Sequence, residues 1–117
     1  MTRPVRKYGV TKGMIHNKSI SILIDSGEIR SYIDPKLVDR LRLEKCKHEC
    51  SWIVQLATRT RGKVSELVRS CLMNLNGLKT VADLNVLPLG SYHVLFGMDW
   101  LESHHAILDC RDKVISS

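Results

Sequence analysis

The chain has 117 residues, of which 44% are apolar and 26% charged, and this composition is typical of one globular domain and excludes a disordered chain. Lys and Arg outnumber Asp and Glu by 18 to 12, so the net charge of +6 raises the question of nucleic-acid binding. Aromatic residues make up only 5% of the chain, which is too few to suggest a base-stacking surface. We therefore expect a basic, solvated surface around an interior of Leu, Ile and Val.

Neither a membrane span nor a secretion signal stands out in the sequence. The longest stretch without Asp, Glu, Lys or Arg runs from Leu84 to Met98, which is too short to cross a bilayer and is broken by polar residues. Residues Thr2–Asn17 mix Arg, Lys, Pro and Gly and do not place an apolar run after a basic start. The sequence therefore predicts an intracellular, cytoplasmic protein that makes no membrane contact.

The four cysteines are expected to stay reduced, because disulfides are rare inside cells. Cys46 and Cys50 enclose His48 in a spacing that is wider than that of most structural zinc sites. No second pair of Cys or His residues with zinc-ligand spacing follows, and Cys71 and Cys110 stand alone. We therefore expect no metal and no cofactor.

Residues 1–9 show no apolar periodicity and are expected to form a flexible basic arm, followed by a single domain over residues 10–117. Val10–Ile15 and Ser19–Ile24 read as the two strands of a hairpin, because only three polar residues separate them. Isoleucine occupies every other position near the end of the second strand, which is typical of a strand with a deeply buried face.

A short helix is expected from Pro35 to Leu41, since Asp34 is a suitable N-cap and proline is favoured at the first helical position. Beyond it, Trp52–Ala57 and Val64–Met73 read as strands on either side of a polar tip, Thr58–Lys63. The sequence thus predicts a long hairpin in the middle of the chain.

Asn76-Gly77 is the strongest hairpin dipeptide in the chain and joins Val64–Met73 to the next strand. The remaining residues are expected to form, in order, a strand, a loop, a short buried strand, a helix and two final strands: Lys79–Leu87, Pro88–Tyr92, Val94–Phe96, Met98–His104, Ala106–Asp109 and Lys113–Ile115. About eight strands and two short helices predict a mostly β fold.

Asp25 is the acidic residue whose surroundings most need an explanation. It follows an isoleucine-rich strand, where a carboxylate is costly unless it is paired, hydrogen-bonded or used in chemistry. Gly27 allows the backbone to turn sharply just after it. Asp-Ser-Gly by itself is common turn chemistry. Asp34 and Asp99 have simpler explanations as a helix cap and a carboxylate in the first turn of a helix.

The residues around Asp25 favour a catalytic role for it over simple turn chemistry. Ile22 to Gly27, followed by Ser31-Tyr32-Ile33, resembles the active-site segment of gypsy-type LTR-retrotransposon aspartic proteases. Leu87 to Leu101 resembles that family's second motif, Leu-Pro-Leu…Tyr-Asp-Val-Ile-Leu-Gly-Met-Asp-Trp-Leu. Between the two motifs, Val54 to Thr58 resembles the strand that leads into the family's flap. The motifs occur in the family's order and the resemblance covers most of the chain.

This resemblance implies a retropepsin-like fold, a small closed β-barrel of the acid-protease type, with Asp25 as the catalytic residue. One Asp-Ser-Gly provides one carboxylate, so a homodimer would supply the second. Two facing carboxylates share a proton, and the ionised one activates a water molecule. Ser26 and Gly27 would complete the active-site loop. Leu95, Phe96 and Gly97 would pack beneath it.

The resemblance also implies a peptide substrate, expected to be a retrotransposon polyprotein of which this domain is part. Glu28, Ile29, Ala57, Thr58 and Arg59 are expected to contact it. The family usually carries a small residue and then Thr or Ser after its Asp-Ser/Thr-Gly, where this chain has Glu28 and Ile29. Glu28 would either face the two catalytic carboxylates or turn outward toward a basic substrate residue.

Two other functions remain open at the level of sequence. The first is a catalytically silent protease-fold module that dimerises or binds peptides, which the changes at Glu28 and Ile29 and the replacement of the family's Tyr-Asp-Val aspartate by His93 favour. The second is a basic nucleic-acid-binding domain, which the net charge alone suggests and the low aromatic content disfavours.

Overall fold

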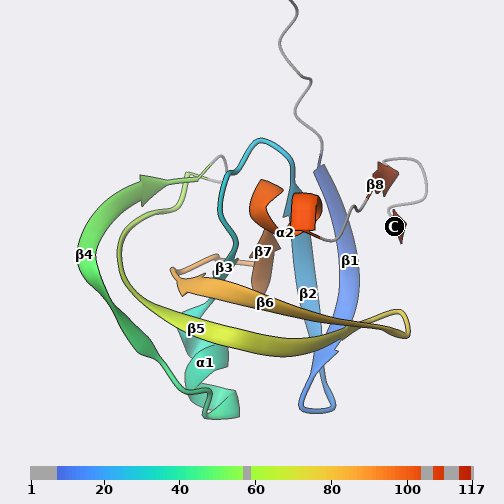
Figure 1. Cartoon of the computed structure of the whole chain (residues 1–117), viewed down its shortest axis with the longest axis horizontal. Helices are drawn as coiled ribbons and strands as arrows, with labels where there is room; N and C mark the ends of the chain where they lie inside the picture. The colour runs from blue at the N-terminus through green and yellow to red at the C-terminus, as the bar shows by residue number, and fades with distance from the viewer. Residues whose placement is uncertain (1–7, 57–58, 104–106, 110–113, 117) are drawn as a thin grey trace, which may run out of the picture.

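The computed structural model describes residues 8–56, 59–103, 107–109 and 114–116 (Figure 1). In these ranges the chain is mostly β, as predicted, with nine strands and two short helices. The strands are β1 (Tyr8–Ile15), β2 (Lys18–Asp25), β3 (Tyr32–Ile33), β4 (Cys46–Gln55), β5 (Arg61–Leu75), β6 (Leu78–Val86), β7 (Val94–Phe96), β8 (Ile107–Asp109) and β9 (Val114–Ser116). The helices are α1 (Pro35–Leu41) and α2 (Met98–Ser103). Neither helix combines the length and apolarity needed to cross a membrane.

Six of the strands close into a barrel. They are hydrogen-bonded in the order β1-β2-β7-β3-β6-β5, and β5 returns to β1 where Met14 pairs with Asn74. β4 pairs with the outer side of β5, and β8 pairs with β9 in a separate sheet (Figure 1). β2 therefore has a hydrogen-bonded strand on each side, β1 and β7, and these two neighbours hold its end, where Asp25 lies.

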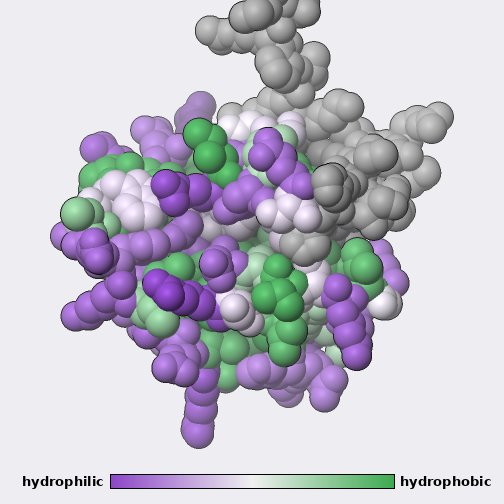
Figure 2. All heavy atoms as spheres, viewed as in Figure 1, coloured by the Kyte–Doolittle hydropathy of each residue, from purple (hydrophilic) through white to green (hydrophobic). Residues whose placement is uncertain are grey.

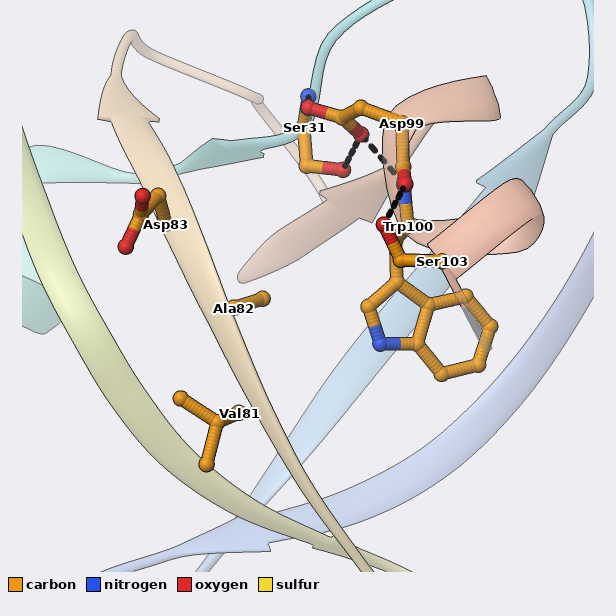
Figure 3. Close-up of a pocket in the computed structure, with 7 residues that line it drawn as sticks. All are labelled: Ser31, Val81, Ala82, Asp83, Asp99, Trp100 and Ser103. Carbon is orange, nitrogen blue, oxygen red and sulfur yellow. Dashed lines mark hydrogen bonds between the residues drawn. The ribbon is translucent and has the colours of Figure 1, made fainter. Parts of the chain in front are cut away.

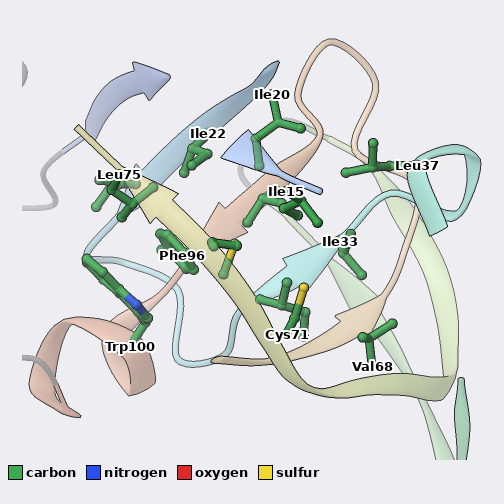
Figure 4. Packing of buried hydrophobic residues seen from close by; sticks show 14 of the residues in the cluster. Ile15, Ile20, Ile22, Ile33, Leu37, Val68, Cys71, Leu75, Phe96 and Trp100 are labelled. Atoms are coloured by element: carbon green, nitrogen blue, oxygen red, sulfur yellow. The ribbon is translucent and has the colours of Figure 1, made fainter. Parts of the chain in front are cut away.

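The barrel is filled mainly by aliphatic side chains. Ile20, Ile22 and Ile24 of β2 are at most 1% exposed and pack in one core cluster with Phe96 (Figure 4). Leu23, on the opposite face of β2, belongs to a second cluster with Tyr32, Leu56, Val64, Leu87, Leu89 and Leu95. β2 is therefore buried on both faces along its second half, which explains its continuous apolar sequence.

On the face shown in Figure 2, the apolar side chains of the described residues are scattered. Green patches are separated there by purple hydrophilic residues. The large hydrophobic side chains that remain exposed are Val10, Met14, Ile29, Ile53, Leu72, Leu78 and Val81. Of these, Ile29 is the most exposed, at 77%, and it lies in the loop after Asp25.

Two strands differ from the sequence prediction. Tyr32 and Ile33 form β3, which was not predicted because two residues carry no periodicity; pairing with β6 and β7 makes them a strand. β4 begins at Cys46, earlier than the predicted Trp52. In the described sheet β4 is an edge strand beside β5, so its added residues are mostly exposed. They are polar and show no apolar alternation that would have predicted a strand.

The tip of the central hairpin is also shorter than predicted. Arg61 to Lys63 were assigned to the polar tip, but they belong to β5 and pair with Gln55, Val54 and Ile53 of β4. The turn is closed by hydrogen bonds from Leu56 N to Thr60 O (2.8 Å) and from Arg59 N to Leu56 O (2.9 Å). Gly62, which suggested a turn, instead lies close to the side chain of Leu87.

The other boundaries agree closely with the prediction. α1 has the predicted bounds, and Asp34 caps it by accepting a hydrogen bond from Lys36 N (2.8 Å). β1 begins at Tyr8, inside the range assigned to the basic arm, and residues 1–7 lie outside the described residues. Residues 104, 106 and 113, at the edges of the predicted last helix and strands, also lie outside them.

Candidate active site

Asp25 is the last residue of β2 and is buried, with 1% of its surface exposed. Its Oδ1 accepts a hydrogen bond from Gly27 N (2.9 Å), and its carbonyl accepts one from Glu28 N (3.2 Å). These bonds fold Asp-Ser-Gly into a tight turn that holds the carboxylate at the end of the strand. The cost of placing a carboxylate beside an apolar strand is thus partly offset by the backbone N–H of Gly27.

The loop over residues 26–31 is fastened from below by the start of α2. Met98 N donates to the carbonyl of Glu28 (2.7 Å), and Asp99 N donates to the carbonyl of Ile29 (3.0 Å). Since N–H groups in the first turn of a helix have no partner within the helix, the loop satisfies them. The same contacts fix the backbone that follows Asp25.

β7 and Gly97 lie directly against this loop. Leu95 and Phe96 are at most 1% exposed and pair in parallel with Leu23 and Ile24 of β2. A Cβ atom on Gly97 would stand 2.4 Å from the carbonyl oxygen of Arg30 and 2.7 Å from that of Glu28. The position therefore requires glycine because the loop backbone passes so closely. Leu95, Phe96 and Gly97 thus lie against the end of β2 and the loop that follows Asp25.

Ser31 and Asp99 form a hydrogen-bonded network that sequence reasoning missed (Figure 3). Asp99 Oδ1 accepts from Ser31 Oγ (2.5 Å) and from Trp100 N (2.6 Å), and Asp99 Oδ2 accepts from Ser31 N (3.1 Å). Ser31 Oγ in turn accepts from Gly97 N (3.0 Å). The sequence predicted Asp99 only as a carboxylate in the first turn of a helix. The structure shows that it also holds Ser31, the last residue of the loop, against α2. The signal available in the sequence was Ser31, part of the first family-like motif.

The pKa of the Tyr32 side chain depends on the charged residues of this loop and of α2. Burial raises the pKa of the Tyr32 phenol, the carboxylates of Glu28 and Asp99 raise it further, and Arg30 lowers it. Glu28 and Asp99 therefore act on the same buried hydroxyl. Glu28 itself is half-buried, so the predicted choice between an inward and an outward orientation stays a prediction.

Of the remaining residues expected to contact substrate, Ile29 is exposed on the loop and Arg59 lies at the turn of the hairpin. Arg59 is exposed and adopts a positive φ of 68° at the turn. Ala57 and Thr58 lie outside the described residues. Leu56, buried to 3% exposure in the second core cluster, anchors the base of the turn. Among the described residues of the turn, Leu56 is the buried apolar one, and Arg59 and Thr60 are polar.

His93 occupies the place of the family's aspartate in the second motif and has a structural role. Its Nδ1 accepts a hydrogen bond from Ser21 N (2.8 Å), and its backbone N donates to Ser21 O (3.0 Å). Its carbonyl accepts from Asp34 N (2.9 Å), next to the start of α1. The imidazole therefore ties β2 to the segment that leads into β7.

The cysteines of the described chain form no cluster with other metal ligands. Cys46, Cys50 and Cys71 are free thiols, and burial raises the pKa of Cys71 to about 11. Cys110 lies outside the described residues. In the described ranges no group of three or more His, Cys, Asp and Glu side chains is placed to hold a metal ion.

Asp25 is therefore a buried carboxylate in an Asp-Ser-Gly turn, at the end of a barrel strand and backed by an apolar strand and Gly97. The sequence profile described as retroviral aspartyl protease matches residues 8–116, so the chain belongs to that family. No curated protein sequence matches the chain.

Comparison with solved structures confirms the retropepsin-like fold. The retroviral protease-like domain of Ddi1 from Leishmania major superposes with a TM-score of 0.71 over 93% of this chain and 86% of that chain. The two sequences share 14% identity. A likeness at that level of identity concerns the fold alone.

Proposed function

We propose that the protein is an aspartic endopeptidase that acts as a homodimer and cleaves a retrotransposon polyprotein. The observation that carries this proposal is the single Asp25 carboxylate, held by Gly27 N in an Asp-Ser-Gly turn of a retroviral aspartyl protease barrel. Hydrolysis in this manner needs two carboxylates that share one proton. The chain has one such motif, so a second copy would provide the other carboxylate.

In the proposed mechanism the two Asp25 side chains hold a water molecule between them. The ionised carboxylate takes a proton from the water, which attacks the peptide carbonyl. The protonated carboxylic acid donates a hydrogen bond to that carbonyl oxygen and then supplies the proton that the leaving nitrogen needs. Ser26 and Gly27 shape the loop, and no covalent intermediate, metal or cofactor takes part.

Access to the carboxylate requires movement around the site, because Asp25 is 1% exposed in the single chain. The hairpin of β4 and β5 is the element proposed to move, with Ala57, Thr58 and Arg59 closing over an extended peptide. Glu28 and Ile29 would contact the same peptide from the loop. The 77% exposure of Ile29 supports this, since a large apolar side chain beside a cleft gains by being covered.

The proposed biological setting rests on the two sequence motifs. Their resemblance to gypsy-type retrotransposon proteases supports a role in processing the polyprotein that contains this domain, inside the cell. The silent-module alternative is favoured by the departures from the family pattern, chiefly Glu28 and Ile29 where the family usually has a small residue and a Thr or Ser. The experiment below separates the two.

The test is cleavage of a mixed peptide library between pH 4 and pH 7 by wild type, Asp25→Asn and Asp39→Asn. Asp39 is an exposed carboxylate on α1 and serves as the matched control. Loss of the general acid and base should lower the rate about 10²–10⁴-fold for Asp25→Asn. Asp39→Asn should cleave as wild type does. If wild type forms dimers and cleaves nothing in this range, the silent-module function replaces the protease function.

A further inference from the structure

A recess of about 450 Å³ opens beside the loop that follows Asp25. Arg30, from that loop, forms one wall, and the two strands of the central hairpin form the others. The residues that line it are Arg30, Lys47, His48, Glu49, Cys50, Trp52 and Arg69. The recess therefore connects the loop of the proposed catalytic residue with the hairpin proposed to close over the substrate.

The recess is electropositive. Arg30, Lys47 and Arg69 are cationic and exposed, and the lining contains one carboxylate, that of Glu49. Glu66 of β5 lies opposite Lys47 in the β4–β5 pairing. Its Oε1 forms an ion pair with Lys45 Nζ at 3.8 Å. Because three cations and one carboxylate line the recess, an anionic group bound there would be attracted.

One of the three cations, Arg30, lies over an aromatic ring. Trp52 is half-buried, and the guanidinium carbon of Arg30 lies 5.0 Å from the centre of its ring. The ring of His48 meets Trp52 edge-on at 4.8 Å, and His48 Nε2 lies 2.7 Å from Asn85 Oδ1. Because a cation–π contact leaves the N–H edges of a guanidinium free to donate, Arg30 is restrained and can still bind a carboxylate in a bidentate manner.

Two irregularities in the sheet give the recess its shape. The β4–β5 register shifts between Lys47 and Trp52, and the β5–β6 register shifts between Val68 and Cys71. At the second shift Ser70 has a positive φ of 50°, and its N–H bonds Asp83 Oδ1 (2.8 Å). Bulges of this kind redirect the side chains beside them, here Arg69 and the residues around Glu49.

We propose that this recess is the subsite that selects an acidic side chain in the bound peptide, at a position away from the cleaved bond. The inference rests on the proposed peptide-cleaving function. An extended peptide passing between the loop and the hairpin would carry its flanking residues past Arg30. A carboxylate there would receive charge-assisted hydrogen bonds from Arg30 and Arg69 and attraction from Lys47. With Trp52 as the one tryptophan of the lining, the recess fits a peptide carboxylate better than a series of stacked bases.

The experiment measures binding, so that it does not depend on turnover. Asp25→Asn protein is titrated with two fluorescent decapeptide libraries that differ in having Asp and Glu, or Asn and Gln, at the flanking positions. The acidic library should bind about tenfold more tightly at low salt, since a carboxylate accepts charge-assisted hydrogen bonds that are stronger than those of a neutral amide. The preference should shrink as added salt screens the exposed cations.

Charge reversal then locates the preference. Lys47→Glu with Arg69→Glu should abolish it and favour a third library with Lys at the flanking positions. Lys18→Glu with Lys79→Glu is the matched control, because both residues are exposed and outside the recess while the change in net charge is the same. The control should keep the preference for the acidic library.

Three results would overturn the inference: equal binding of the acidic and amide libraries, loss of the preference in the control as well, or tighter binding of a ten-nucleotide poly-dT that depends on Lys47 and Arg69. Failure of the catalytic proposal looks different. In that case wild type cleaves neither library, while the acidic preference and its reversal by the Lys47→Glu and Arg69→Glu changes persist.

Discussion

At the scale of single residues, Gly97 lies in close contact with the backbone of the loop after Asp25. The nearest neighbours of an added Cβ are backbone atoms of Arg30 and Glu28, which cannot rotate away. Gly97→Ala should therefore shift the loop after Asp25 and lower the free energy of unfolding by about 1–3 kcal/mol in urea denaturation.

Gly62→Ala is the control for this prediction. Its added Cβ would also meet an atom at 2.7 Å, but that atom is the end of the flexible Leu87 side chain. We expect a smaller loss of stability because the leucine can move aside. Equal losses in the two variants would show that the backbone contact at Gly97 is unimportant.

Glu28 is the residue whose charge acts most directly on a neighbour in the site. The pKa of Tyr32 is raised by burial first and by the Glu28 carboxylate second, so Glu28→Gln should lower that pKa toward its usual value. A raised phenol pKa means that the folded state keeps its proton longer, so this contribution to stability is present below the unfolded pKa and is lost as pH rises through the folded one. Because the unfolded pKa is unchanged, the variant should lose less of this contribution and should complete the loss at lower pH.

NMR of ¹³C-labelled tyrosine, titrated into the alkaline range, measures the Tyr32 pKa directly. Glu44→Gln is the control, because Glu44 is exposed and is not among the charges that act on Tyr32. A Tyr32 titration that is the same in wild type and Glu28→Gln would place the Glu28 carboxylate outside the site.

At the scale of elements, the loop and α2 form one unit through Asp99. Asp99→Ala removes the acceptor of Ser31 N, Ser31 Oγ and Trp100 N. Leaving these donors without their acceptor should destabilise the protein by about 1–3 kcal/mol. Amide hydrogen exchange over residues 26–31 should also become faster, since the loop loses its anchor.

Glu102→Ala, at an exposed position of the same helix, tests whether this effect belongs to Asp99. It should leave exchange in the loop unchanged. If Asp99→Ala also leaves it unchanged, the hydrogen bonds from Met98 N and Asp99 N to the loop carbonyls are sufficient to hold it.

The elements that could be predicted from sequence are those with local signals. Asp34 and Pro35 marked the start of α1, and Asn76-Gly77 marked the β5–β6 turn, where Leu75 pairs with Leu78. β3 and the first half of β4 carry no such signals, because they become strands through pairing with distant segments. The hydrogen bonds between Ser31 and Asp99 also join distant segments. They were not predicted, because each residue by itself has a common local explanation.

At the scale of the whole molecule, the closed barrel explains why a short chain can hold a buried carboxylate in place. Pairing of β1 with β5 completes the ring, and β2 lies between β1 and β7 within it. The family motifs predicted this architecture, whereas composition and periodicity alone predicted only a small β-rich domain. The order of strands could not be read from local patterns, since β2 pairs with β7 across most of the chain.

The central claim is that two copies of Asp25 make one catalytic site, and mixing tests it most directly. Wild type and Asp25→Asn are combined in different ratios at a fixed total concentration high enough for dimers, and cleavage of the best library peptide is measured. If chains pair at random, an equal mixture retains about one quarter of the wild-type rate, because only that share of dimers carries two Asp25 residues. Activity should follow the square of the wild-type fraction. A rate that falls in simple proportion to that fraction would mean that each chain acts alone, and would contradict the shared site.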